Sequence, residues 1–393
     1  MTSGPTAFEA DAVRALAGRW LSCLGDDDFV CSPVGLWLAL AAVASGARGR
    51  TAEELRGLLG VDGEAAGAAV TDVGRRLAGT GGVVSATGVW SRVPVLDAFR
   101  RGLPGVGFGV LPGAPAWFEL PDEVFGATDD MSLGEIPAVA QDELDDWVRE
   151  ATGGRIAGLP LGLDGSEDLV LVNALALKAS WLTAFPAHLT RDEPFTDGCG
   201  DTRPVPTMRQ RIPAVWVWSV DGVTVVELPC DGDGAARVRF ALGPEGDGPA
   251  EVLPAAWAGP TAREGLVADS ADLLLPRFTL RTRTDVHDHL PALGVRRALS
   301  RHGADFSGLS PAGLFVSKVL QEALVEVAEE GVEAAVVTQV TMTRSAAPAR
   351  REVVERIAFD RPFGVVVLDA SGELPLFAGW CRSAPGGAGS GAP

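Results

Sequence analysis

The stretch SKVLQEALVEVAEEGVEAAVVT, residues 317–338, places two strand-like segments on either side of Glu-Glu-Gly. After Gly331 the side chains alternate, and successive side chains of a strand point to opposite faces. One face of the second segment carries Val332, Ala334, Val336, Thr338, Val340 and Met342. The other carries Glu333, Ala335, Val337, Gln339, Thr341 and Thr343 and is mostly polar. This pattern is typical of a strand with one face on a core.

The residues that follow look like a protease-sensitive loop. In TMTRSAAPARR, residues 341–351, Arg344-Ser345 and Arg350-Arg351 are bonds that a trypsin-like protease favours. The pattern alone allows an ordinary strand followed by an exposed loop, or a strand-forming segment that can enter a sheet. Burying five such side chains would contribute roughly 5–12 kcal/mol, which rivals the stability of an ordinary domain.

The rest of the chain predicts helices first and strands later. Ser32-Pro33 before VGLWLALAAVA is an N-cap followed by proline at the first helical position. TAEEL, from Thr51, is a capping box for a helix that ends at Gly60. DLVLVNALALKASW, residues 168–181, predicts a strand that is buried on both faces. Asp221-Gly222 predicts a hairpin turn. We expect one α+β domain over residues 1–382 and a flexible Gly/Ala/Ser/Pro tail over 383–393.

Charge and composition exclude several classes of partner. The net charge is −19, so duplex nucleic acid and anionic membranes would repel the surface. Arginine far outnumbers lysine and tyrosine is absent, which resembles a protein from a GC-rich bacterial genome. The N-terminus shows no signal peptide, which favours a cytoplasmic location, although extracellular export by another route is compatible with the same sequence.

The sequence contains no convincing enzyme, metal or cofactor site. The five cysteines are widely spaced and odd in number, so we expect reduced structural thiols. His287 and His289 are interpreted as an exposed structural pair at the start of a helix. No G-x-S-x-G motif occurs. Arg75-Arg76 is too small a basic cluster for a heparin-type activator, so we expect no cofactor, no catalytic residue and no metal ligand.

Several of these motifs, in this order, resemble the serpin family of protease inhibitors. Residues 317–338 resemble the serpin hinge signature. FVCSPVGLWLALAAVASGARGRTAEELRGLLG, LVNALALKASWLTAFPAHLTRDEPF, ADFSGLS and FDRPFGVVVLDASGELPLFAGW resemble other serpin segments. The resemblance covers the chain from about Phe29 to Trp380. It implies a serpin fold of about nine helices packed on three β-sheets, with an exposed reactive-centre loop at about residues 331–352.

The resemblance also implies a mechanism. A serine or cysteine protease cleaves the loop and forms an acyl-enzyme. The loop then inserts as a new strand of the main sheet and distorts the protease before deacylation, because the native fold is kinetically trapped. The expected partner is a trypsin-like or subtilisin-like serine protease, and the expected inhibitor is a monomer.

The implied site residues form four groups. The hinge comprises Glu329, Glu330, Gly331, Val332, Glu333, Ala334, Ala335, Val336 and Val337. At the breach, where the loop first enters the sheet, Glu329 pairs with Arg277 and Trp181 caps the region. The shutter at mid-sheet comprises Ser32, Asn173 and Gln321. The reactive bond is Arg344-Ser345.

Three departures from the family pattern keep alternatives open. Val332 stands where serpins usually have Thr or Ser, and Val336 and Val337 replace smaller residues, so a non-inhibitory serpin-fold binding protein remains an alternative. Gln321 stands where serpins usually have a histidine. The loop is longer than usual, so Ser345 or Arg350 could precede the scissile bond instead of Arg344.

Overall fold

The computed structural model describes residues 5–111, 136–159, 162–332 and 352–386. This described part contains α-helices α1 Pro5–Leu24, α2 Pro33–Ala44, α3 Gly49–Leu59, α4 Gly63–Ala78, α5 Asp97–Arg101, α6 Ile136–Ala151 and α7 Pro249–Ala256. It also contains 3₁₀ helices η1 Ala187–Leu189, η2 Ala214–Trp216, η3 Pro260–Ala262, η4 Val286–His289 and η5 Arg297–Leu299. In these ranges no helix is both long enough and apolar enough to cross a membrane.

The described part contains seven α-helices, and five further short segments form 3₁₀ turns. The segment with His287 and His289 is one such turn, and Pro291 follows it closely and disfavours a longer helix. His289 is half-buried rather than exposed, and its Nδ1 accepts a hydrogen bond from Trp20 Nε1 at 3.0 Å. The prediction of a capping box that starts at Thr51 is also wrong. Helix α3 begins at Gly49, with Arg48 as its N-cap.

Three sheets are present, as expected. The main sheet has the order β3 Gly107–Val110, β2 Val83–Ser91, β4 Leu169–Leu177, β14 Val316–Val327, β15 Gly331–Val332 and β5 Ala179–Ser180, and β13 Phe278–Asp285 also pairs with β14. The second sheet has the order β1 Phe29–Cys31, β18 Pro375–Cys381, β17 Phe363–Leu368, β10 Arg237–Leu242, β9 Val223–Pro229, β8 Val217–Val220 and β11 Glu264–Gly265. The third has the order β16 Val354–Ala358, β12 Ser270–Pro276, β7 Thr202–Pro213 and β6 Arg191–Thr196.

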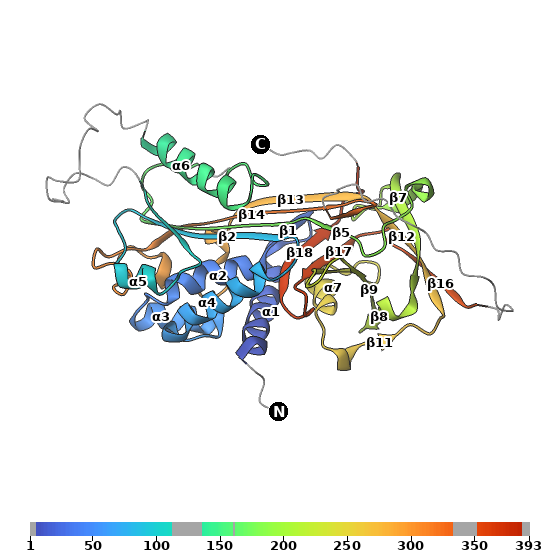
Figure 1. Cartoon of the computed structure of the whole chain (residues 1–393), viewed down its shortest axis with the longest axis horizontal. Helices are drawn as coiled ribbons and strands as arrows, with labels where there is room; N and C mark the ends of the chain where they lie inside the picture. The colour runs from blue at the N-terminus through green and yellow to red at the C-terminus, as the bar shows by residue number, and fades with distance from the viewer. Residues whose placement is uncertain (1–4, 112–135, 160–161, 333–351, 387–393) are drawn as a thin grey trace.

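The main sheet is covered on both faces. Helices α2, α3 and α4 lie on one side of it and α6 lies on the other (Figure 1). Along β4, Leu169, Leu171, Leu175 and Leu177 belong to the large core on the α2 side. Val170, Val172 and Ala174 belong to a smaller cluster that includes Leu144 and Val148 of α6. Strand β4 is therefore buried on both faces, as its sequence predicted.

The third sheet and the C-terminal segment complete the body. Strand β16, which follows the loop region, pairs in parallel with β12. Ala384 is buried, and its carbonyl accepts a hydrogen bond from Arg203 Nη2 at 3.3 Å. Packed structure therefore extends into the first residues of the segment that was expected to be a flexible tail, whereas residues 387–393 lie outside the described part.

Candidate functional site

A short returning strand enters the main sheet at the end of β14. The turn after Val327 is closed by backbone hydrogen bonds between Ala328 and Gly331, at 3.0 and 3.3 Å. Strand β15 then runs antiparallel to both neighbours: Val332 is the register partner of Val327 in β14 and of Ala179 in β5. Val332 is completely buried, so the chain has already placed one side chain of the returning strand in the core.

Beyond Val332, no strand in the described part of the main sheet separates β4 from β14. Strands β4 and β14 pair directly with each other from Leu169 and Val316 to Ala176 and Leu324. They run parallel, and β15 runs antiparallel to β14. A strand that continued from β15 would therefore have to separate β4 from β14, and it would then gain two antiparallel ladders.

Glu329 anchors the turn between β14 and β15. Its Oε1 accepts hydrogen bonds from Arg277 Nε at 2.7 Å, from Arg277 Nη2 and from Thr190 Oγ1 at 2.6 Å. The sequence predicted the pairing with Arg277, and the structure contains it. Burial raises the pKa of Glu329, but the hydrogen bonds from Arg277 and Thr190 outweigh burial and hold this pKa below its ordinary value. The carboxylate is therefore kept ionised at the entry of the sheet.

Trp181 holds the same turn from the other side. Its indole Nε1 donates to Ala328 O at 2.9 Å, and its backbone N donates to Glu330 O at 3.0 Å. Its ring also lies edge-on to Phe240, with the ring centroids 6.3 Å apart. Trp181 is thus positioned over the entry, and it couples the turn to the second sheet.

Gln321 and Ser32 meet at mid-sheet. Gln321 Oε1 accepts from Ser32 N at 2.7 Å, and Gln321 Nε2 donates to Ser32 O at 2.9 Å. Ser32 also caps α2, because its Oγ accepts from Gly35 N at 3.1 Å. The amide at position 321 therefore joins β14 to the start of α2 through two buried hydrogen bonds and carries no titratable group.

Asn173 lies next to Gln321 in register, on β4. Its Nδ2 donates to Thr87 Oγ1 at 3.2 Å and to Ala86 O at 3.4 Å. Its Oδ1 is buried and has no hydrogen-bond partner. A Cβ at Gly35 would lie only 1.8 Å from this oxygen, so the glycine leaves room for the amide. We call Thr87, Asn173 and Gln321 the mid-sheet row.

The residues just after the loop are clamped to the third sheet. Glu352 accepts hydrogen bonds from Ser270 Oγ at 2.8 Å and from Arg211 Nη1 at 3.1 Å. Asp269 and Val353 exchange two further hydrogen bonds, each 2.9 Å long. Sequence reasoning missed this clamp. Its members are far apart in the chain, and no local pattern marks them.

Part of the expected site cannot be placed. Gly331 and Val332 of the hinge lie in β15. Residues Glu333, Ala334, Ala335, Val336, Val337, Arg344, Ser345 and Arg350 lie outside the described residues. Gly331 is confined by its neighbours, because an added Cβ would lie 2.1 Å from Ala179 O.

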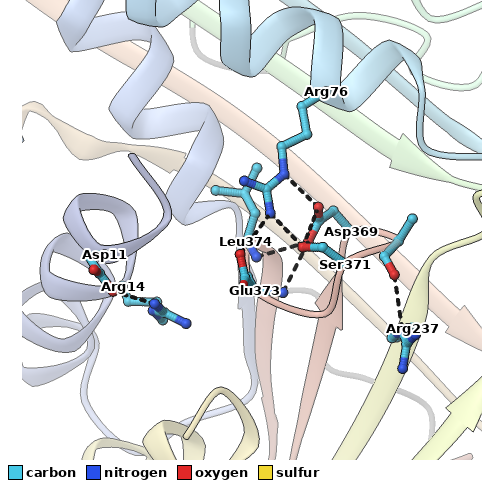
Figure 2. A network of polar contacts seen from close by, with 9 residues as sticks. Asp11, Arg14, Arg76, Arg237, Asp369, Ser371, Glu373 and Leu374 are labelled. Atoms are coloured by element: carbon cyan, nitrogen blue, oxygen red, sulfur yellow. Dashed lines mark hydrogen bonds and ion pairs between the residues drawn. The ribbon is translucent and has the colours of Figure 1, made fainter. Parts of the chain in front are cut away.

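The paired arginines of α4 face different surroundings. Figure 2 shows Arg76 pointing into the turn between β17 and β18, where its Nε donates to Asp369 Oδ2 at 2.6 Å and its Nη2 to Ser371 Oγ at 2.6 Å. Arg75 instead pairs on the surface with Asp72 at 2.7 Å. Both cations therefore pair with acidic groups of this chain.

None of the five cysteines forms a disulfide. Cys31, Cys230 and Cys381 are buried, and burial raises the pKa of Cys230 to about 12. Among the described residues, no group of three His, Cys, Asp or Glu side chains could hold a metal ion.

Comparison with known proteins supports one family. The family model described as Serpin (serine protease inhibitor) matches residues 119–383. An uncharacterized serpin-like protein of Thermococcus kodakarensis is 28% identical over 389 residues, which cover 95% of this chain and 83% of that protein. Antitrypsin of Bombyx mori is 33% identical over 214 residues, covering 53% of this chain and 54% of the relative. Leukocyte elastase inhibitor of Equus caballus is 31% identical over 265 residues, covering 59% and 69%.

Solved structures agree with this assignment at the level of the fold. Thyroxine-binding globulin in complex with thyroxine aligns with a TM-score of 0.75 at 22% identity and covers 96% of this chain and 99% of that one. The thermophilic serpin tengpin, in its native state, aligns with a TM-score of 0.74 at 20% identity and covers 98% and 95%. Because the family model spans well over half of the sequence, this chain belongs to the serpin family.

Proposed function

We propose that this chain is a suicide-substrate inhibitor of serine endopeptidases, and that its targets are trypsin-like. A protease would cleave the loop at Arg344-Ser345 and form an acyl-enzyme. The freed segment after β15 would then insert between β4 and β14 and carry the protease with it. Arginine before the scissile bond suits the acidic specificity pocket of a trypsin-like enzyme. Cysteine proteases also form acyl-enzymes and could be trapped in the same way.

The position of β15 carries this proposal. Val332 is completely buried between β14 and β5, while β4 and β14 are still paired with each other below it. This is the geometry expected before insertion: the first residue of the new strand is in place, and the rest of its path is closed. The names of two relatives, antitrypsin and leukocyte elastase inhibitor, point to the same class of activity.

A non-inhibitory binding protein is the second candidate. Valine at 332, 336 and 337 is bulkier than the serpin pattern favours, and slow insertion would let deacylation win. Thyroxine-binding globulin, which the fold resembles, was solved with thyroxine bound. The seating of Val332 without any exposed surface favours the inhibitor, because valine is accommodated at the first position of the new strand.

The proposal also covers the oligomeric state, the cofactors and the partners of this chain. We propose a monomer with no cofactor, no heparin-type activator and no catalytic activity of its own. Nucleic acids and membranes are not among its proposed partners, because the chain carries a net charge of −19. Its proposed location is the cytoplasm, with extracellular action if another export route exists.

Incubation with trypsin tests the function. The wild-type chain should form a complex that survives denaturing electrophoresis at the summed mass, with the acyl bond after Arg344 by mass spectrometry. Arg344→Ala should abolish that complex, and Arg350→Ala is the matched control that should keep it. Complete cleavage without a complex by trypsin, an elastase-like enzyme and a subtilisin-like enzyme would favour the non-inhibitory candidate. A complex that persists in Arg344→Ala and disappears in Arg350→Ala would move the reactive bond to Arg350.

A further inference from the structure

Three arginines gather around one carboxylate on one face of the second sheet. Glu227 of β9 accepts hydrogen bonds from Arg237 Nη1 at 3.1 Å and from Arg239 Nε at 2.8 Å, and both arginines lie on β10. Arg263, which follows η3, lies over the ring of Trp218 on β8, with its Cζ 4.5 Å from the ring centroid. The Cζ of Arg239 lies 5.3 Å from the same centroid. We call Trp218, Glu227, Arg237, Arg239 and Arg263 the arginine cluster.

The arginine cluster carries more positive charge than its own residues neutralise. Within the described ranges, Glu227 is the only carboxylate that pairs with any of its arginines, so three guanidinium groups and one carboxylate leave a net charge of +2. By contrast, Arg75 and Arg76 on α4 each pair with an aspartate. Burying a charge that is not neutralised costs free energy, and the side chain of Arg239 is only 3% exposed.

The pKa values of the cluster follow from the same imbalance. Burial lowers the pKa of Arg239, Glu227 raises it, and Arg263 and Arg237 lower it again. Burial also lowers the pKa of Arg263, and there too Glu227 raises the pKa while Arg237 lowers it. The single carboxylate therefore does not offset burial and the mutual repulsion of the arginines, and a second anion would help to do so.

The arginine cluster also has donors that the folded chain does not use. Within the described part, Arg237 Nη2, Arg239 Nη2 and Arg263 Nη1 donate no hydrogen bond to protein atoms. Trp218 Nε1 is buried without a partner, and Trp218 is only 7% exposed. Gly372 leaves room beside these donors, because a Cβ there would lie 2.9 Å from Arg239 Nη2. Arg237 is exposed and Arg263 is half-buried, so the cluster can be reached from solvent.

We propose that the arginine cluster binds a small dianionic oxyanion of the phosphate or sulfate type. Such oxyanions suit guanidinium groups, because two parallel N–H groups can donate to two oxygens, and two negative charges match the excess of +2. Arg239 and Trp218 would donate from the buried side, and Arg237 and Arg263 from the solvent side. Arg237 Nε already donates to Ala370 O, in the turn between β17 and β18, at 3.0 Å (Figure 2). A bound anion would tie this turn to β8, β10 and the segment after η3, and would stabilise the native chain by mass action.

Isothermal titration calorimetry of the full chain tests this inference, in phosphate-free buffer at fixed ionic strength. Sodium phosphate and sodium sulfate are the probes, and chloride and acetate are the monovalent controls. Arg263→Gln removes one cation without leaving a carboxylate unpaired, because within the described residues Arg263 donates only to Ala258 O. Arg263→Lys keeps the charge but not the planar fork. Arg301→Gln is the matched control, because Arg301 also lies over an aromatic ring, that of Phe315 at 5.0 Å, but outside the cluster.

We expect the wild-type chain to bind a single phosphate or sulfate ion and to show no saturable binding of chloride or acetate. Arg263→Gln should weaken phosphate binding by at least about tenfold, because hydrogen bonds to a charged group are lost. The affinity of Arg263→Lys should lie between those of wild type and Arg263→Gln, and Arg301→Gln should bind as wild type does. No saturable binding by the wild-type chain, or equal affinities in wild type and Arg263→Gln, would overturn the inference.

A second measurement decides the question even where Arg263→Gln does not fold. In proton–nitrogen correlation NMR spectra, the indole signal that is missing from Trp218→Phe identifies Trp218. This signal should shift in the wild-type chain as phosphate is added, and it should stay in place when chloride is added. Phosphate and sulfate also stabilise proteins in general, because they are excluded from protein surfaces. If phosphate raises the unfolding midpoint while the Trp218 signal does not move, only that general effect operates and the site does not exist.

Discussion

Glu329 and Arg277 form an ion pair at the point where β14 turns back into β15. The arginine lies between β12 and β13, and the glutamate lies in the turn that precedes the only two loop residues seated in the main sheet within the described ranges. The pair therefore ties the third sheet and β13 to the entry of the main sheet, and Thr190 adds a further hydrogen bond. Loss of this carboxylate should destabilise the turn between β14 and β15 before it affects the rest of the fold.

This ion pair predicts a pH dependence at the acid end. Burial raises the pKa of Glu329, but the hydrogen bonds from Arg277 and Thr190 lower it by more than burial raises it. The folded-state pKa therefore lies below the ordinary value of 4.5. Its stabilising contribution is present above about pH 4.5 and is lost as the pH falls through the lower folded-state pKa. We expect Glu329→Gln to reduce the unfolding midpoint in guanidinium at pH 7 and to approach wild type as the pH falls from 4.5 through the folded-state pKa.

Glu326→Gln is the control for this experiment, because Glu326 lies exposed near the end of β14, just before the turn that holds Glu329. Its unfolding midpoint should follow that of wild type across the whole pH range. If the difference between Glu329→Gln and wild type is the same at pH 7 and at low pH, the ionised carboxylate is not the source of the stability.

Gln321 predicts a stability effect at mid-sheet. Gln321→Leu keeps the volume but leaves the N–H of buried Ser32 without a partner, and it leaves the Ser32 C=O with only the hydrogen bond from Leu36 N at 3.1 Å. We expect it to lower the free energy of unfolding of the native chain by about 2–4 kcal/mol. Gln210→Leu is a matched control, because Gln210 is also buried but its Nε2 has no partner. Equal losses in the two variants, measured by guanidinium unfolding, would contradict the role of the two hydrogen bonds.

Local signals in the sequence predicted features that depend on a few neighbouring residues. Ser32 caps α2, Pro33 is its first residue, and Gly60 ends α3 in the left-handed region with φ of 73°. The turn at Asp221-Gly222 joins β8 and β9, and both residues have positive φ. In each case the backbone conformation is decided within one turn of chain.

The capping box failed because distant groups use its side chains. Thr51 Oγ1 accepts from Asp305 N at 3.0 Å, and Glu54 Oε2 accepts from the backbone N atoms of Arg296 and Arg297 at 2.8 and 2.7 Å. The clamp around Glu352 escaped detection for the same reason, since Ser270 and Arg211 are 82 and 141 residues away. Long-range polar contacts of this kind follow from the topology of the sheets and not from local pattern.

Asp369 predicts a second effect on stability, remote from the loop. Its carboxylate accepts from Arg76, from Ser371 and from the backbone N atoms of Glu373 and Leu374 (Figure 2). Burial raises the pKa of Asp369, but these donors outweigh burial and hold the pKa below its usual range. We expect Asp369→Ala to lower the free energy of unfolding by about 3–5 kcal/mol, because it removes one partner of a buried ion pair.

Asp72→Ala tests whether that loss comes from the buried environment. Asp72 pairs with Arg75 on the neighbouring position of α4, but both side chains are well exposed. Exposed pairs contribute about 0–1 kcal/mol, so this variant should stay close to wild type in guanidinium unfolding. A loss for Asp369→Ala as small as that for Asp72→Ala would show that the turn rearranges to satisfy Arg76.

Gly331 predicts a change in function rather than in overall stability. An added Cβ would lie 2.1 Å from Ala179 O and 2.7 Å from Ser180 Cα, and both of these are backbone atoms that cannot move aside cheaply. Gly331→Ala should therefore expel β15 from its place between β14 and β5. Because the new strand could no longer start at the entry, deacylation would overtake insertion. We expect trypsin to cleave this variant with at least about a tenfold loss of trapped complex per cleaved chain, a shift of about 1.4 kcal/mol in the competition between insertion and deacylation.

Gly265→Ala is the control, because Gly265 lies on edge strand β11 with nothing within 4 Å of an added Cβ. It should give as much trapped complex as the wild-type chain. Undiminished trapping by Gly331→Ala would mean that insertion does not begin at β15.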